Sequence, residues 1–159
     1  VAHARETLLL SPGNLEALWV LGWSATAMRR FDTAIPALES AVEKGGSPFS
    51  LAGLGAARAH AGDRAGAEAV ISRLHGAATS IHVSPMNFAW VYLALADCER
   101  GIQWLEKARQ EHDSQVLCVR VSPSNDGVRD DPRFRAFVET LHLPAPVVKY
   151  SSRSGPGLT

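Results

Sequence analysis

LEALWVLGWSATAMRRFDTAIPALESAVEK, residues 15–44, decides the fold, because its pattern of small and apolar residues returns further along the chain. The pair Leu21-Gly22 recurs as Leu54-Gly55, 33 positions later. The other key positions recur after 33 and then 34 residues: Ala34, Ala67 and Gly101; Leu38, Ile71 and Leu105; Ala41, Leu74 and Ala108. A period in this range is typical of stacked helical hairpins, so the sequence predicts an all-α array.

Turn and capping residues divide the chain into predicted helices. Asn14, Asp32, Asp63 and Asp97 precede periodic apolar segments, and their side chains can bond the first free backbone N–H groups of a helix. Residues 1–10 read as the last turns of a helix, and further helices are expected at 15–29, 33–44, 48–61, 64–77, 85–96, 98–111 and 132–141. Residues 116–121 fit either a short helix or an extended segment.

Two glycines lie inside predicted helices at the same phase of the repeat. Glycine costs roughly 1 kcal/mol against alanine in a helix interior. Gly22 and Gly55 therefore need a compensating contact, and close approach of the paired helix is the simplest one. Pro36 is expected in the first turn of its helix, where no backbone donor is required.

The composition argues against several classes of protein. The 159 residues carry 16 basic and 16 acidic side chains and 46% hydrophobic residues, so the chain offers no field that attracts nucleic acid. It has no run of roughly eighteen apolar residues that would insert into a membrane. No signal peptide is visible, and the start at Val1 inside a predicted helix favours a fragment of a longer protein.

Cysteine, histidine and acidic residues show no ligand motif. Cys98 and Cys118 are predicted to be small apolar side chains in a reducing, cytoplasmic compartment, with a disulfide or redox pair as the open alternative. The six histidines are scattered, and Asp126, Asp130 and Asp131 lack the spacing of a calcium loop. No metal or cofactor is therefore expected, and Asp131 is expected to cap the last helix.

The repeated letters resemble the tetratricopeptide repeat. The first copy matches that family's pattern at Leu18, Leu21, Gly22, Ala25, Ala34, Leu38 and Ala41. The second matches at Leu51, Leu54, Gly55, Ala67, Ile71 and Leu74, with Arg58 as a departure. The third lacks the Leu-Gly pair and matches at Pro85, Phe88, Ala89, Tyr92, Gly101, Leu105 and Ala108.

This resemblance covers about residues 1–112 and implies a right-handed α-solenoid of about three helical hairpins with a C-terminal capping helix. Residues 1–144 would form one repeat domain, with repeats at about 15–47, 48–80 and 84–112 and a cap at about 113–144. The small, polar residues 145–159 predict a disordered tail.

A narrower resemblance rests on the segments GGSPFSLAGLGAARAHAGDRAGAEAVISRL, VSPMNFAWVYLALADCERGIQWLEKARQEHD and VRDDPRFRAFVETLHLP. In this order they look like the C-terminal repeat region of bacterial signalling proteins such as protein kinases, adenylate cyclases and winged-helix regulators. The resemblance implies that the chain is the C-terminal interaction region of a longer regulator.

In tetratricopeptide arrays, the first helix of each repeat lines a concave face. The family's inward positions correspond here to Trp19, Trp23, Thr26, Ala52, Ala56, His60, Met86, Trp90 and Leu93. Independently of the family, Trp19 and Trp23 are four residues apart and share one helix face. The predicted surface is an apolar trough with aromatic walls and a shallow middle, suited to an apolar peptide or helix.

The tryptophans have a second interpretation, in which they pack against a neighbouring helix and line no groove. Trp104 is expected to pack in this way. The inward positions offer no basic fork, so recognition of a peptide's terminal carboxylate is not expected.

The sequence therefore predicts a non-enzymatic scaffold that binds a peptide or protein segment on its concave face. The alternative is a regulatory sensor domain that binds a small apolar ligand. No catalytic residues are expected, because no phosphate loop, nucleophile motif or paired catalytic carboxylates occur. Self-association through an exposed terminal repeat is a further expectation.

Overall fold

The computed structural model describes residues 2–11, 13–122 and 125–143, apart from the side chains of residues 2 and 5. In chain order the elements are α1 (Ala2–Leu10), α2 (Leu15–Ala27), α3 (Phe31–Glu43), α4 (Pro48–His60), α5 (Arg64–Ala77), α6 (Pro85–Ala94), α7 (Cys98–Gln110), the 3-10 helix η1 (Ser114–Cys118) and α8 (Pro132–Thr140). The all-α prediction is confirmed, and no strand occurs within these residues. The tail predicted at 145–159 lies outside the described residues.

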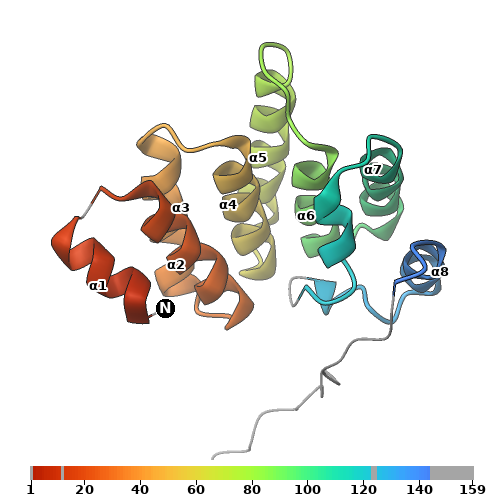
Figure 1. The fold of residues 1–159 in the computed structure, drawn as a ribbon, viewed down its shortest axis with the longest axis horizontal. Helices are drawn as coiled ribbons and strands as arrows, with labels where there is room; N and C mark the ends of the chain where they lie inside the picture. The colour runs from red at the N-terminus through yellow and green to blue at the C-terminus, as the bar shows by residue number, and fades with distance from the viewer. Residues whose placement is uncertain (1, 12, 123–124, 144–159) are drawn as a thin grey trace, which may run out of the picture.

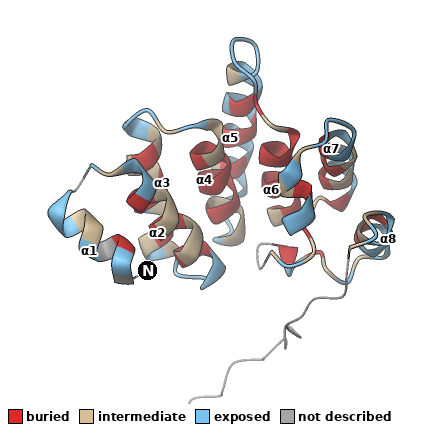
Figure 2. Ribbon diagram, in the orientation of Figure 1, coloured by how far each residue is buried: buried red, intermediate tan, exposed pale blue. Residues whose placement is uncertain are grey.

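The helices pack against their neighbours in chain order. Helix α2 pairs with α3, α4 with α5, and α6 with α7. In addition, α3 packs on α4, α5 packs on α6, and α4 lies between α2 and α6. Figure 1 shows the helices side by side, from α1 at one end of the molecule to α8 at the other. Helices α4 and α6 in the middle are mostly buried, whereas α1 and α8 are largely exposed (Figure 2).

The two internal glycines lie where paired helices approach closely. A Cβ at Gly22 would collide with Leu38 of α3 and come within 2.7 Å of its Cδ2. A Cβ at Gly55 would lie 2.8 Å from a methyl of Val70 in α5 and 2.8 Å from a methyl of Val91 in α6. The predicted close approach of the second helix is therefore confirmed at both positions.

The turns inside the three helix pairs share one backbone conformation. Arg29, Gly62 and Ala96 have positive φ angles of 57°, 89° and 59°, at intervals of 33 and 34 residues. In each turn the next N–H bonds a carbonyl five residues back: Arg30 to Ala25 at 2.8 Å, Asp63 to Arg58 at 2.9 Å, and Asp97 to Tyr92 at 2.9 Å. This is the hydrogen bond of a Schellman helix end. The repeat of letters is therefore also a repeat of backbone geometry.

Four of the predicted helix caps are confirmed. The side-chain oxygens of these residues accept hydrogen bonds from backbone N–H groups of the first turn: Asn14 from Ala17 at 2.8 Å, Asp63 from Gly66 at 2.8 Å, Asp97 from Arg100 at 3.0 Å and Asp131 from Arg133 at 2.9 Å. These bonds satisfy donors that have no partner inside the helix.

The cap predicted at Asp32 is wrong, because α3 begins earlier than expected. The Arg30 carbonyl already accepts the N–H of Ala34 at 2.9 Å, so helical bonding starts there and Phe31 is the first helical residue. Asp32 lies in the first turn, where a carboxylate is favoured by the helix dipole. The same early start places Pro36 beyond the first turn of α3.

The sequence left two options for residues 116–121, and the structure makes this segment helical only at its start. Residues 114–118 form the short 3-10 helix η1, and residues 119–121 form a turn. Asp113 accepts the N–H of Gln115 at 2.9 Å at the start of η1. Helix α8 then packs on α7 and buries Phe134 and Phe137 in the main core. The last described helix therefore closes the apolar side of α7.

We expect Gly22→Ala to destabilise the protein by about 1–3 kcal/mol, because the added methyl overpacks against Leu38. Gly55→Ala should have the same effect against Val70 and Val91. Gly76→Ala in α5 is the matched control, since a Cβ there meets nothing within 4 Å. Urea unfolding at equilibrium measures all three changes, and an equal loss for Gly76→Ala would contradict the packing explanation.

We expect Ala96→Gly to stabilise the protein by roughly 0.5–1 kcal/mol. The left-handed backbone conformation of Ala96 costs about 1–2 kcal/mol, and glycine removes this cost. Glycine also makes the unfolded chain more flexible, which lowers the gain in stability by about 0.4–1 kcal/mol. Gly62→Ala, the reverse change at the equivalent turn, should lower stability by a similar amount. Thermal unfolding tests the pair; identical midpoints for both variants and the parent would refute the shared turn geometry.

Candidate functional site

Four aromatic side chains from three helices form one cluster, which we call the aromatic cluster: Trp19 and Trp23 of α2, Phe49 of α4 and Trp90 of α6. The Phe49 ring is central, with its centroid 5.4 Å from that of Trp19, 5.2 Å from Trp23 and 5.3 Å from Trp90. The Trp23 and Trp90 rings are 5.1 Å apart. Three of these contacts are edge-to-face, an arrangement that aromatic quadrupoles favour.

The Trp23 indole lies directly against the backbone of α4. A Cβ at Gly53 would come within 2.9 Å of Trp23 Cε2 and Nε1, so only glycine leaves room for the ring. The Nε1 donor is buried and has no hydrogen-bond partner among the described residues. An unsatisfied buried donor costs about 1–3 kcal/mol, so the ring contacts must outweigh this cost to hold Trp23 in place.

The cluster is only partly covered by protein. Trp90 is buried, whereas Trp19, Trp23 and Phe49 are half-buried. The side of the cluster that belongs to α2 and α4 therefore presents aromatic surface to solvent. Each of these rings contacts at least one other ring of the cluster.

The remaining predicted binding residues divide into two groups. Those with 3% exposure or less are Thr26, Ala52, Ala56, Met86 and Leu93. Their side chains lie against neighbouring helices and expose almost no surface to a partner. A binding role for these five residues stays a prediction. His60, at the end of α4, is half-buried.

The structure also corrects the predicted shape of the surface. The sequence places Trp19 and Trp23 on one wall and Trp90 on the other, with a shallow middle above Ala52 and Ala56. Instead the rings of Trp23 and Trp90 meet, and Phe49 fills the space between the helices. The two predicted walls of the trough are therefore in contact, because the small residues of α4 allow α2 and α6 to approach each other.

Phe49 was missing from the predicted site, although the sequence contained a signal for it. It precedes Ala52 by three residues and Gly53 by four, and residues at these spacings share a helix face. The inward positions of the tetratricopeptide pattern do not include Phe49, which lies in the first turn of α4. Only the packing of the helices shows that Phe49 contacts all three tryptophans of the aromatic cluster.

Trp104 belongs to a different group of rings and packs as predicted. It stacks on Phe88 with centroids 4.1 Å apart and an angle of 13° between the planes. His75 of α5 lies beside both rings, and Lys107 Nζ lies 5.0 Å from the Trp104 ring centroid. This group joins α5, α6 and α7.

The described residues contain no group of three or more histidine, cysteine or acidic side chains that could hold a metal ion. The expectation of no metal and no cofactor stays a prediction. Within the same residues, no helix combines the length and apolar character needed to span a bilayer.

Cys98 and Asp131 join the starts of α7 and α8. Both cysteines are free, with Cys98 buried and Cys118 exposed, so the structure shows no disulfide between them. Burial and a hydrogen bond to Asp131 raise the pKa of the Cys98 thiol to about 11. Hydrogen bonds from Arg133 hold the pKa of the Asp131 carboxyl well below its usual range.

These shifts have opposite consequences for stability. A raised thiol pKa contributes stability below the ordinary thiol pKa, and this contribution is lost as pH rises through about 11. A lowered carboxyl pKa contributes stability above its unfolded value, and this contribution is lost in strong acid. Between these limits the junction of α7 and α8 is held in its neutral-thiol, charged-carboxylate form.

No protein-family model, curated protein or solved structure matches this chain.

We expect Cys118 to react with a thiol reagent at pH 8 in the folded protein, because its side chain is exposed. Cys98 should react only on unfolding, since it is buried and its raised pKa keeps it a thiol at that pH. Stoichiometry with Ellman's reagent should be one thiol before and two after addition of denaturant. Cys118→Ser is the control; rapid labelling of that variant in native buffer would contradict the burial of Cys98.

Proposed function

We propose that this chain is a non-enzymatic interaction module that binds a peptide or protein segment across α2 and α4. The observation that carries the proposal is the aromatic cluster, whose rings Trp19, Trp23 and Phe49 are half-buried and packed against one another. Such rings contribute large apolar contact area, and tryptophan is enriched among residues that dominate binding energy at interfaces.

The proposed architecture is a tetratricopeptide-like right-handed α-solenoid. The order of helix contacts and the equivalent turns at Arg29, Gly62 and Ala96 support it, because a solenoid repeats one hairpin and one hairpin interface. The resemblance to bacterial signalling proteins supports a place in the cytoplasm, as the C-terminal interaction region of a longer regulator.

Packing of the rings against one another favours binding. An interface that must first order its side chains loses roughly 0.5–1.5 kcal/mol for each one that it immobilises. Phe49 contacts all three tryptophans, and Gly53 lies under Trp23, so these rotamers are already restricted in the free protein. Binding a partner would therefore cost little further ordering of these side chains.

The same geometry favours a peptide over a small apolar ligand as the partner. A small ligand is best bound in a concave pocket that covers most of its surface. Here Phe49, Trp23 and Trp90 contact one another and fill the space that such a ligand would need. A peptide or a partner helix can instead lie across Trp19 and Phe49 without entering the cluster.

We expect selection from a random peptide phage library to yield peptides that bind through the exposed rings. Trp19→Gln together with Phe49→Gln should weaken binding of a selected peptide by at least about tenfold, or 1.4 kcal/mol. Trp19→Phe should retain most of the binding because it keeps an aromatic ring. Isothermal titration measures the affinities, and circular dichroism checks that each variant is folded.

Leu117→Ser, an exposed apolar residue in η1 outside the aromatic cluster, is the matched control and should leave peptide affinity unchanged. Selected peptides that bind the double variant as well as the parent would refute the proposed face. A thermal-shift screen with lipophilic metabolites runs in parallel. A response to these compounds, with no ring-dependent peptide recovered, would favour the sensor alternative.

A further inference from the structure

Charged side chains are almost absent from the three helices that carry the aromatic cluster. Helix α6 has none, α2 has only Glu16, and α4 has only Arg58 apart from His60. The second helices of the three pairs, α3, α5 and α7, each carry several acidic or basic residues. The charge in the helix pairs is therefore concentrated on the helices that do not contribute rings to the cluster.

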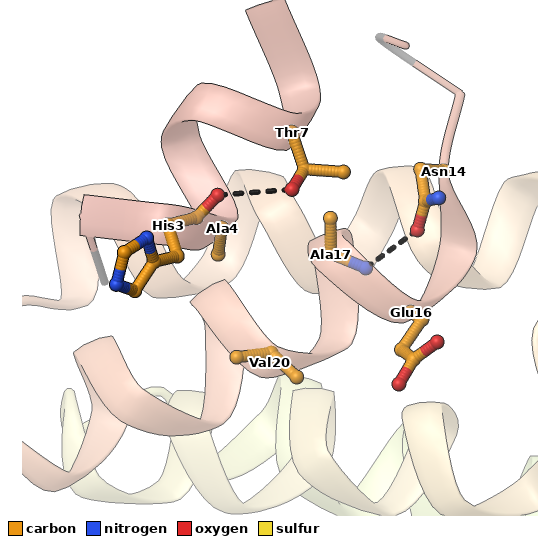
Figure 3. A pocket seen from close by; sticks show the side chains of 7 residues that line it. All are labelled: His3, Ala4, Thr7, Asn14, Glu16, Ala17 and Val20. Carbon is orange, nitrogen blue, oxygen red and sulfur yellow. Dashed lines mark hydrogen bonds between the residues drawn. The ribbon is translucent and has the colours of Figure 1, made fainter. Parts of the chain in front are cut away.

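The few charged groups beside the cluster are directed to other neighbours. Glu16 lines the cleft between α1 and α2 (Figure 3). Arg58, near the far end of α4, pairs with Glu39 of α3 at 2.7 Å. Lys44, just before α4, lies toward Gly13, where an added Cβ would be 3.8 Å from its Nζ. A charged side chain placed on the exposed rings would thus lose its water without gaining an opposite charge.

The exposed rings lie on helices, which limits the backbone that a partner can present to them. Beyond their first turns, α2 and α4 bond their N–H and C=O groups internally, so they offer no row of backbone partners as a sheet edge does. An extended peptide laid on the rings would leave its inward backbone groups unpaired, which is unfavourable for each group. A helical segment satisfies its own backbone groups and meets the rings with side chains alone.

The spacing of the rings also argues against a polyproline segment. Such a segment keeps its backbone in water but docks its side chains into slots between aromatic rings. A group held between two rings needs about 7–8 Å between their centroids, since each contact takes 3.5–4.0 Å. The ring centroids of the aromatic cluster are between 5.1 and 5.4 Å apart, so no side chain enters between them. A partner has to lie across the rings.

Helix α4 shows which kind of helix surface receives an indole ring in this protein. Trp23 lies against Gly53, where an added Cβ would come within 2.9 Å of the ring. Ala52 and Ala56, four residues apart on the same helix, are completely buried. A helix face of small residues therefore lets a tryptophan approach the backbone closely.

On the basis of the proposed function, we propose that the partner segment is an α-helix whose contact face is uncharged and consists of small residues four positions apart. Alanine, glycine or serine at this spacing share one helix face. They would let the partner helix lie across Trp19 and Phe49 as closely as α4 lies to Trp23. The charged residues of the partner are on its outer faces, where they remain in water.

Selection from two display libraries tests this partner class. One library contains linear random peptides, and the other contains a helical-bundle scaffold randomised on one helix face. Binders are kept when Trp19→Gln together with Phe49→Gln weakens them at least about tenfold. We expect the helical library to yield such binders, with small residues four positions apart and no charge at the centre of the contact face. Linear binders should become helical on binding, measured by circular dichroism.

The other outcomes separate this partner class from the proposed function. Ring-dependent binders that are charged at the contact, or that bind in an extended or polyproline form by NMR, would overturn the helical partner and leave the proposed function standing. The absence of ring-dependent binders from both libraries would overturn both.

An uncharged contact also predicts an affinity that does not depend on salt. For a selected helical binder, the Kd should change less than about twofold between roughly 50 and 500 mM sodium chloride, because salt screens charge pairs. Glutamate in place of one contact-face alanine of the binder should weaken binding at least about tenfold, whereas glutamate on its outer face should not.

Glu16→Gln and Lys44→Gln are the matched controls on this chain and should leave the Kd unchanged, because neither side chain is directed to the rings. Isothermal titration measures all of these affinities. A loss of about tenfold at high salt, or with either control, would overturn the uncharged contact.

Discussion

The contact between the bare backbone of Gly22 and the side chain of Leu38 sets how close two paired helices can lie, and Gly55 has the same role against Val70. Gly55 also faces Val91 of the following pair, so one missing Cβ permits two helices to approach α4. A side chain at either position would collide with these neighbours unless the helices or the facing side chains moved apart. The thin, closely spaced layers of this protein depend on that absence of side-chain volume.

The aromatic cluster is a consequence of the same spacing. Ala52 and Ala56 are fully buried on α4, and Gly53 lies under Trp23, so the middle helix offers a face of small residues. Helices α2 and α6 can then bring Trp23 and Trp90 into direct contact across it. Large rings on the outer helices and small residues on the middle one are complementary, which explains how three tryptophans and a phenylalanine form one group.

Local signals in the sequence were sufficient for much of the fold. Asn14, Asp63 and Asp97 cap helices as predicted, because a cap depends on only three or four neighbouring residues. The glycine contacts were also predictable, since a helix tolerates an internal glycine only with compensation. Asp32 was misplaced because the preceding turn, closed by Arg30, sets where α3 begins. The site was less predictable: Phe49 and the meeting of Trp23 with Trp90 depend on how separate helices are placed.

The contact of Trp23 with Trp90 has a spectroscopic consequence. Two indoles with centroids 5.1 Å apart and planes inclined at 70° couple their electronic transitions, which splits the absorption band into a pair of circular-dichroism signals of opposite sign. The splitting changes steeply with separation and tilt. Because the two rings come from α2 and α6, the size of this splitting reports the distance between the first and third helix pairs without an added label.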